Sequence, residues 1–108
     1  MKTGLSIETK ISSEILNIIV SGEIDSSNYE IFKNEVFEAY SASANIKQIS
    51  FDIGGCDMIS SNGFGIFYEL IDTIEKRNSK IAVSIRNANS AIKKIIKLLK
   101  MTDEFDVQ

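Results

Sequence analysis

The stretch from Ile49 to Ile74 constrains the fold more than any other part of the chain. Its first residues alternate between apolar and polar side chains, which is typical of a half-buried β-strand. We expect Gly54 and Gly55 to end that strand. Apolar residues then recur at helical spacing, which predicts an amphipathic helix after a glycine-rich turn. These residues are Phe64, Phe67, Ile71 and Ile74.

Two serines, Ser60 and Ser61, fall at or just before the N-terminus of this predicted helix. Backbone N–H groups are unpaired there and point outward. Serine at such a place has two interpretations. It is a favoured N-cap residue, and it is also an exposed hydroxyl where an added phosphate would lie at the positive end of the helix dipole.

The residues before this stretch predict two strands and a helix. Residues 5–9 alternate in polarity, and the run Ile15–Val20 has the length of a strand, so we expect an antiparallel pair joined through a turn at Ser12–Ser13. A helix should begin at about Ser27, with Ser27 and Glu30 forming a capping box. Its predicted apolar face consists of Tyr29, Phe32, Val36, Phe37 and Tyr40.

The residues after the central helix predict a strand, a helix and a short final strand. The central helix should end near Arg77, the next strand covers residues 80–85, and Ser90 is expected to cap the last helix. Residues 105–107 suit a last short strand. Four apolar residues of the last helix are expected to point inward. They are Ile92, Ile95, Ile96 and Leu99.

Lysines form a row on the last helix, at Lys93, Lys97 and Lys100. The simplest interpretation is a solvated face with cations placed favourably near a helix C-terminus. The alternative is a contact surface for an acidic partner.

The predicted order of elements is β-β-α-β-α-β-α-β, in a single α/β domain that covers residues 1–108. Strands separated by helices imply parallel pairing with right-handed crossovers, and the opening pair adds an antiparallel edge strand. We therefore expect a mixed, mostly parallel sheet flanked by three to four helices.

Composition limits the functions that this chain can have. The 108 residues are 44% apolar and 25% charged, which is ordinary for one soluble globular domain. A net charge of −3 argues against binding to nucleic acid. No apolar run reaches the roughly 20 residues that span a bilayer, and the N-terminus lacks an apolar signal core. Together with a single cysteine, Cys56, this favours a cytoplasmic protein that does not insert into a membrane.

The motifs expected of several enzyme classes are missing. A serine hydrolase needs a Gly-x-Ser-x-Gly turn and a histidine base, and the chain has neither. Gly63-Phe64-Gly65 alone is a weak nucleotide signal without a phosphate-binding lysine. A response regulator could use Asp52 and Asp57, but no acidic pair ends the first strand. We therefore expect no catalytic residue, no metal site and no cofactor.

The serine-containing turn resembles a known family. The run Ser60-Ser61-Asn62-Gly63-Phe64-Gly65 is similar to the turn of STAS domains in bacterial anti-sigma factor antagonists, whose pattern is roughly Asp-Ser-Ser/Ala-Gly-Leu-Gly. Ser60 replaces the Asp of that pattern, and Asn62 replaces a small residue. Gly22-Glu23-Ile24-Asp25 resembles the end of the family's second strand, and the resemblance extends over nearly the whole chain.

The resemblance implies a regulatory protein that is not an enzyme. In this scheme the unphosphorylated protein binds an anti-sigma factor that is also an ATP-dependent serine kinase. Phosphorylation of Ser61 ends the binding, and a phosphatase restores it. Because Ser60 stands where the family has Asp, Ser60 is an alternative acceptor. The protein would be a monomer or weak dimer.

We expect a partner-binding surface around this turn. It comprises Asp25, Met58, Ser60, Ser61, Asn62, Gly63 and Phe64. Simpler roles exist for two of these residues: Asp25 as a solvated carboxylate that stabilises a helix start, and Phe64 as part of the core. A different class of function also remains open, namely a STAS scaffold without a switch, either stressosome-like or the partner of a transport complex. Small-ligand binding at the turn is the third possibility.

Overall fold

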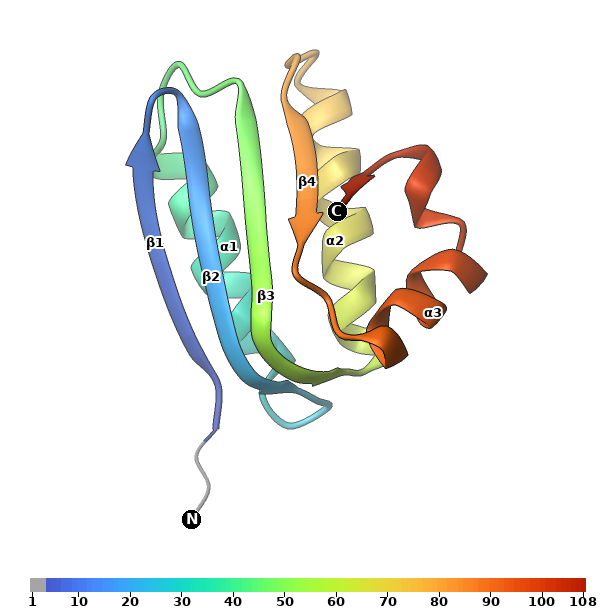
Figure 1. Ribbon diagram of the computed structural model, residues 1–108. Coiled ribbons are helices and arrows are strands. Elements are labelled where there is room, and N and C mark those ends of the chain that lie inside the picture. The colour runs from blue at the N-terminus through green and yellow to red at the C-terminus, as the bar shows by residue number, and fades with distance from the viewer. Residues whose placement is uncertain (1–3) are drawn as a thin grey trace.

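The structure is a computed structural model that describes residues 4–108 (Figure 1). Its elements, in chain order, are β1 (Ser6–Ser12), β2 (Ile15–Ile24), α1 (Tyr29–Ala42), β3 (Gln48–Ile59), α2 (Ser61–Lys76), β4 (Ala82–Arg86), α3 (Ser90–Leu98), a 3-10 turn (Met101–Asp103) and β5 (Asp106–Val107). The predicted order β-β-α-β-α-β-α-β is confirmed.

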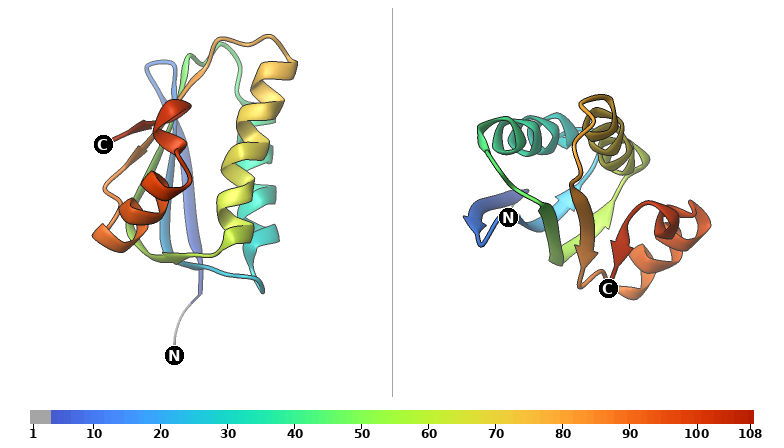
Figure 2. Two further views of the ribbon diagram at one scale, coloured as in Figure 1. Left: turned by 90° about the vertical axis from the view of Figure 1, so that its right-hand side faces the viewer. Right: turned by 90° about the horizontal axis from the view of Figure 1, so that it is seen from above.

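The five strands form one mixed sheet in the order β1-β2-β3-β4-β5. β1 is antiparallel to β2, and the remaining neighbours are parallel, as predicted. α1 and α2 lie side by side against one face of the sheet, and α3 lies at the β4–β5 side (Figure 2). Within residues 4–108, no helix is long and apolar enough to span a bilayer.

The core between the sheet and its two covering helices is built around aromatic rings. Phe51 of β3 and Phe67 of α2 have ring centroids 4.8 Å apart, and Phe32 of α1 lies 5.7 Å from Phe67. All three side chains are fully buried. The apolar spacing that predicted α1 and α2 therefore corresponds to the faces that fill the core.

The hairpin of β1 and β2 turns at Ser13 and Glu14, one residue later than expected. Both residues have positive φ angles, of 52° and 67°, which suit a tight two-residue hairpin turn. β2 also continues past Val20, where the apolar run ends, to Ile24, which agrees with the strand end that the resemblance placed at Gly22–Asp25. Gly22 has a φ of 96° at a point where the register with β3 shifts, so the strand continues through a bulge.

The expectation that Gly54 and Gly55 end the third strand is wrong. β3 continues through both glycines to Ile59, first between β2 and β4, then beyond Asp52 beside β2 alone. A Cβ atom on Gly55 would lie 2.7 Å from the Oγ atom of Ser21. The glycine therefore permits a close approach of two strands.

Two predicted helix starts are also wrong. α1 begins at Tyr29 without a capping box: the side chain of its N-cap residue, Asn28, makes no capping hydrogen bond. α3 is capped by Asn89, whose Oδ1 accepts from the N–H of Ile92 at 2.8 Å, so Ser90 is the first helical residue. Asn binds a backbone N–H three residues on as well as Ser does, which makes the two hard to distinguish in sequence.

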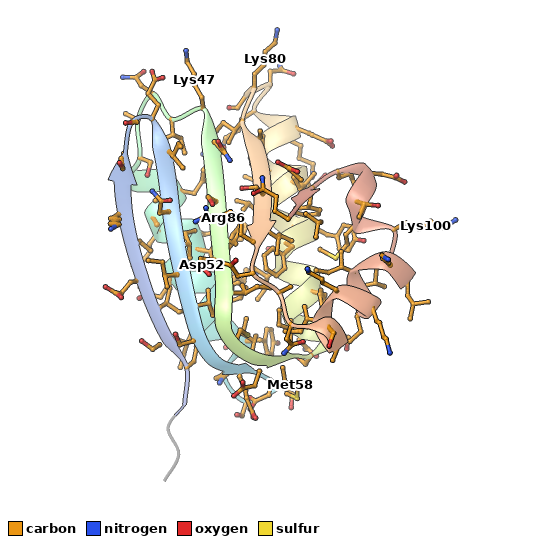
Figure 3. The ribbon with its side chains drawn as sticks, viewed as in Figure 1. Lys47, Asp52, Met58, Lys80, Arg86 and Lys100 are labelled. Carbon is orange, nitrogen blue, oxygen red and sulfur yellow. The ribbon has the colours of Figure 1, made fainter. Side chains whose placement is uncertain are left out.

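The lysine row is shorter than expected. Lys100 lies after the end of α3 in the left-handed conformation, with a φ of 56°, and its side chain extends away from the body of the molecule (Figure 3). Lys93 and Lys97 are exposed on the helix. The row therefore forms no continuous helical stripe.

Candidate functional site

The predicted site lies where β2 and β3 end together. Ile24 and Ile59 are register partners at these ends, and the N–H of Ser60 donates to the carbonyl of Ile24 at 2.8 Å. Asp25 and Ser60 therefore follow two neighbouring strand ends, and α2 begins at the next residue, Ser61. The fold brings these predicted site residues to one edge.

Ser60 and Ser61 have different environments. Ser60 is half-buried, and its Oγ accepts from the N–H of Gly63 at 3.3 Å, so it is the N-cap of α2. Ser61 is exposed in the first position of the helix. Among residues 4–108 its hydroxyl has no hydrogen-bond partner. The two interpretations of the serine pair thus separate: the cap is Ser60, and the free hydroxyl is Ser61.

Gly63 fixes how closely α2 approaches the strand ends. It is buried, and a Cβ atom there would lie 2.7 Å from Cγ2 of Ile24 and 2.8 Å from Cγ2 of Ile59. Only a residue without a side chain fits this contact. Its neighbour Asn62 is exposed. Gly63 therefore supports the turn, and its own surface is not available to a partner.

The other residues of the predicted partner-binding surface also differ in exposure. Phe64 is 4% exposed and belongs to the core, whereas Met58 is 41% exposed at the end of β3 (Figure 3). Asp25 is half-buried beside them. Its carboxylate accepts from the hydroxyl and N–H of Ser27 and from the N–H of Asn28, and these bonds lower the pKa of Asp25. Asp25 thereby orders the turn that leads into α1.

An apolar groove of about 370 Å³ lies beside Ser61, between α2 and α3. It is lined by Ile59, Ser61, Phe64, Gly65, Tyr68, Ile95 and Leu99. The prediction that Ile95 and Leu99 point into the core is wrong, because they are 37% and 44% exposed. Ile92 and Ile96, in contrast, are buried as expected.

Hydrogen bonds hold the two walls of this groove in place. The side-chain N–H of Asn89 donates to the carbonyls of Cys56 and Asp57, which ties the start of α3 to the end of β3. At the other end, the Tyr68 hydroxyl on α2 donates to the carbonyl of Leu99 at 3.0 Å. The groove is therefore a built feature between fixed elements.

Sequence reasoning did not identify the α3 wall of the groove. The signal was present, because apolar residues occupy five positions between Ile92 and Leu99, more than one buried stripe needs. Leu98 shows the excess most clearly, since it is 80% exposed. Tyr68 is a further lining residue that the sequence did not single out, and Gly65 was recognised only as part of the turn motif.

Two titratable groups of β3 have shifted pKa values. Burial raises the pKa of the Cys56 thiol, which disfavours the nucleophilic thiolate. A hydrogen bond from the Asn87 side chain lowers the pKa of Asp52, which lies on β3 away from Met58 at the end of that strand (Figure 3). Residues 4–108 contain no group of three or more His, Cys, Asp or Glu residues that could hold a metal ion.

These features describe a small α/β domain with a mixed sheet, a serine at the start of the helix after its third strand, and an apolar groove beside that serine. The STAS domain family model matches residues 6–108, so this chain belongs to the STAS domain family. No curated protein sequence matches the chain.

Solved structures share the fold at low sequence identity. An anti-sigma factor antagonist from Mycobacterium paratuberculosis is 18% identical, with a TM-score of 0.80 over 96% of this chain and 85% of that one. The anti-sigma factor antagonist SpoIIAA in its unphosphorylated form is 13% identical, with a TM-score of 0.69 over 95% of this chain and 87% of that one. The Bacillus cell fate determinant SpoIIAA in its phosphorylated form has the same identity and TM-score, over 95% and 91%.

Proposed function

We propose that this protein is an anti-sigma factor antagonist that is switched by phosphorylation of Ser61. The unphosphorylated protein binds an anti-sigma factor that is also a serine kinase, and it acts in the cytoplasm. The kinase transfers the γ-phosphoryl group of ATP to the Ser61 Oγ, which loses its proton, and ADP leaves. A phosphatase hydrolyses the phosphoserine and restores binding. The protein is the substrate of this cycle and not its enzyme.

The observation that carries this proposal is the exposed Ser61 hydroxyl at the rim of the apolar groove. A kinase needs a hydroxyl that it can reach, and Ser61 is exposed whereas the Ser60 hydroxyl is half-buried and caps α2. The groove offers apolar area for the same partner. The fold of an antagonist solved in both phosphorylated and unphosphorylated forms supports the assignment.

A phosphate on Ser61 can end binding without refolding the protein. It adds about −1.5 to −2 charges, and the N-terminus of α2 tolerates an anion locally. In a closed interface the same group must lose its water next to the apolar residues Ile59 and Phe64. This desolvation costs several kcal/mol on an order-of-magnitude estimate. About 2.8 kcal/mol already lowers the affinity a hundredfold.

The test is intact-mass measurement and phosphopeptide mapping after incubation with the candidate kinase and ATP. The parent is compared with Ser61→Ala and with the matched control Ser60→Ala. We expect one phosphoryl group on the parent and on Ser60→Ala, and none on Ser61→Ala. Circular dichroism should show that both variants remain folded.

Two results would contradict the proposal in different ways. Loss of the phosphoryl group only in Ser60→Ala would move the acceptor to Ser60. A kinase that binds the parent but phosphorylates neither serine would rule out the switch. That second result would leave a constitutive antagonist or a scaffold subunit as the function of this STAS domain.

A further inference from the structure

β1 forms one outer edge of the sheet and is open to another strand. It has seven residues, its register with β2 is unbroken from Ser6 to Ser12, and no strand among residues 4–108 pairs with its outer side. An edge with free N–H and C=O groups is usually protected by proline, a bulge, a short length or charged side chains such as lysine. β1 carries two charged side chains, Glu8 and Lys10, and they have opposite signs. The chain contains no proline, and β1 has no bulge toward β2. The opposite edge, β5, has only two residues.

The sequence of β1 is complementary to itself when it is reversed. It reads Ser-Ile-Glu-Thr-Lys-Ile-Ser from residue 6 to residue 12, with Thr9 at its centre. In an antiparallel pair of two such strands centred on Thr9, serine faces serine and isoleucine faces isoleucine. Glu8 of each copy faces Lys10 of the other.

We propose that two copies of this chain pair through β1, antiparallel and centred on Thr9, to form a ten-stranded sheet. The proposal stands apart from the function proposed above. The two-fold axis is perpendicular to the sheet, so the helices of both copies lie on the same side. The interface then contains two Glu8–Lys10 pairs, each formed between the two copies. Opposite charges directly across two strands stabilise a sheet.

The two faces of β1 fit this arrangement. Ile7 and Ile11 are register partners of the buried residues Val20 and Leu16, so they lie on the helix-covered face of the sheet. Ile11 is nevertheless 54% exposed, because no further strand covers it. Pairing with Ile7 of a second copy would cover it, since neighbouring β-branched side chains pack well. Glu8 and Lys10 lie on the opposite face.

The charges also select one register. A shift of two residues in one direction would place Glu8 opposite Glu8 of the second copy. A shift in the other direction would place Lys10 opposite Lys10. Like charges directly opposite each other destabilise a sheet, so only the register centred on Thr9 forms both favourable pairs and keeps the isoleucines together.

The proposed β1–β1 interface is small, and it joins no more than two copies. A single seven-residue edge buries less area than the roughly 1,200–2,000 Å² of a stable interface, so we expect weak association. The short β5 edge offers no second site for growth, so pairing stops at the dimer. β1 and α3 lie at opposite sides of the molecule (Figure 1), which leaves both α2–α3 grooves accessible in the dimer.

The test is sedimentation velocity of the purified chain over a range of concentrations, with charge-reversal variants. Glu8→Lys places lysine opposite lysine in both pairs, and Lys10→Glu places glutamate opposite glutamate. We expect the dimerisation affinity of each single variant to be lower than that of the parent, by up to about tenfold. An equimolar mixture of the two should form a heterodimer, because both cross-strand pairs are then attractive. The double variant Glu8→Lys/Lys10→Glu should dimerise like the parent.

Glu35→Lys is the control, because it changes the net charge as Glu8→Lys does, at an exposed residue of α1. It should dimerise like the parent. A parent that stays monomeric at the highest concentration would overturn the proposal. So would dimers that persist unchanged in both single variants, since those dimers must use another surface. Circular dichroism checks that each variant is folded.

Discussion

The two walls of the groove beside Ser61 are helices of opposite character. α2 buries seven of its sixteen residues, and it has no exposed large apolar side chain. α3 buries only Ile92 and Ile96, while Ile95, Leu98 and the adjoining Leu99 are exposed. The apolar residues of α2 are explained by the core, and those of α3 are not. The comparison indicates that α2 is held by the core and positions the site, whereas α3 leaves apolar surface exposed beside it.

The largest effect that we predict from this comparison concerns two adjacent residues of α3. Ile96→Ala should lower the free energy of unfolding by about 2–5 kcal/mol, because Ile96 is 1% exposed and the truncation leaves a cavity. Ile95→Ala, the matched control, should lower it by about 1 kcal/mol or less, since Ile95 already contacts solvent. Urea denaturation followed by circular dichroism measures both.

The same pair distinguishes packing from binding. Ile95→Ala should weaken binding to the kinase partner while the protein stays folded, because Ile95 lines the groove. Equal losses of stability in the two variants would mean that α3 is packed as evenly as α2. The contrast between the two walls would then be wrong.

A second, smaller prediction compares two glycines of α2. Gly63→Ala should lower the free energy of unfolding by about 1–3 kcal/mol, because its Cβ would press on Ile24 and Ile59. Gly65→Ala should be neutral or should stabilise by up to about 1 kcal/mol, since nothing lies within 4 Å of its Cβ and alanine favours a helix. Thermal unfolding monitored by circular dichroism gives both values. A neutral Gly63→Ala would show that α2 can move away from the strand ends.

Much of the fold was predictable because period-two and helical apolar patterns are local signals. They placed α2 within one residue of its end and gave the order of all the main elements. The error at Gly54 and Gly55 has a physical cause: a glycine pair suits a turn, and it equally suits two backbones in close approach. The contact that decides between these two possibilities joins Gly55 to Ser21 of β2, and these residues are far apart in the sequence.

The site was predictable in part for the same reason. The start of α2 follows from the apolar spacing after Ser61, and a cap at Ser60 follows from the preference of serine for that position. The exposure of Ile95 and Leu99 does not follow from spacing, because both share a helical stripe with Ile92 and Ile96. α3 lies at one side of the sheet, so only part of that stripe reaches the core. Such a placement is a tertiary property.

The smallest predicted effect concerns the start of α1, where the cap differs from that of α2. Ser60 caps α2 with a neutral hydroxyl, whereas the Asp25 carboxylate orders the turn before α1. Because hydrogen bonds from Ser27 lower the pKa of Asp25 in the folded protein, its contribution to stability is fully present above the unfolded pKa of about 4. It is lost as the pH falls through the lower folded pKa. The stability of α2's cap should not change over this range.

Asp25→Asn should therefore be slightly less stable than the parent at pH 7, and the difference should shrink as the pH falls below about 4. Thermal unfolding at a series of pH values between about 2 and about 7, which covers the titration range of carboxylates, measures this difference in stability. Glu35→Gln serves as the matched control for removal of a carboxylate, because the Glu35 carboxylate accepts no hydrogen bond among residues 4–108. A constant difference between Asp25→Asn and the parent at every pH would mean that the charge of Asp25 does not stabilise the turn. In that case hydrogen bonds to an uncharged side chain would be enough to order the turn before α1, as they are at the cap of α2.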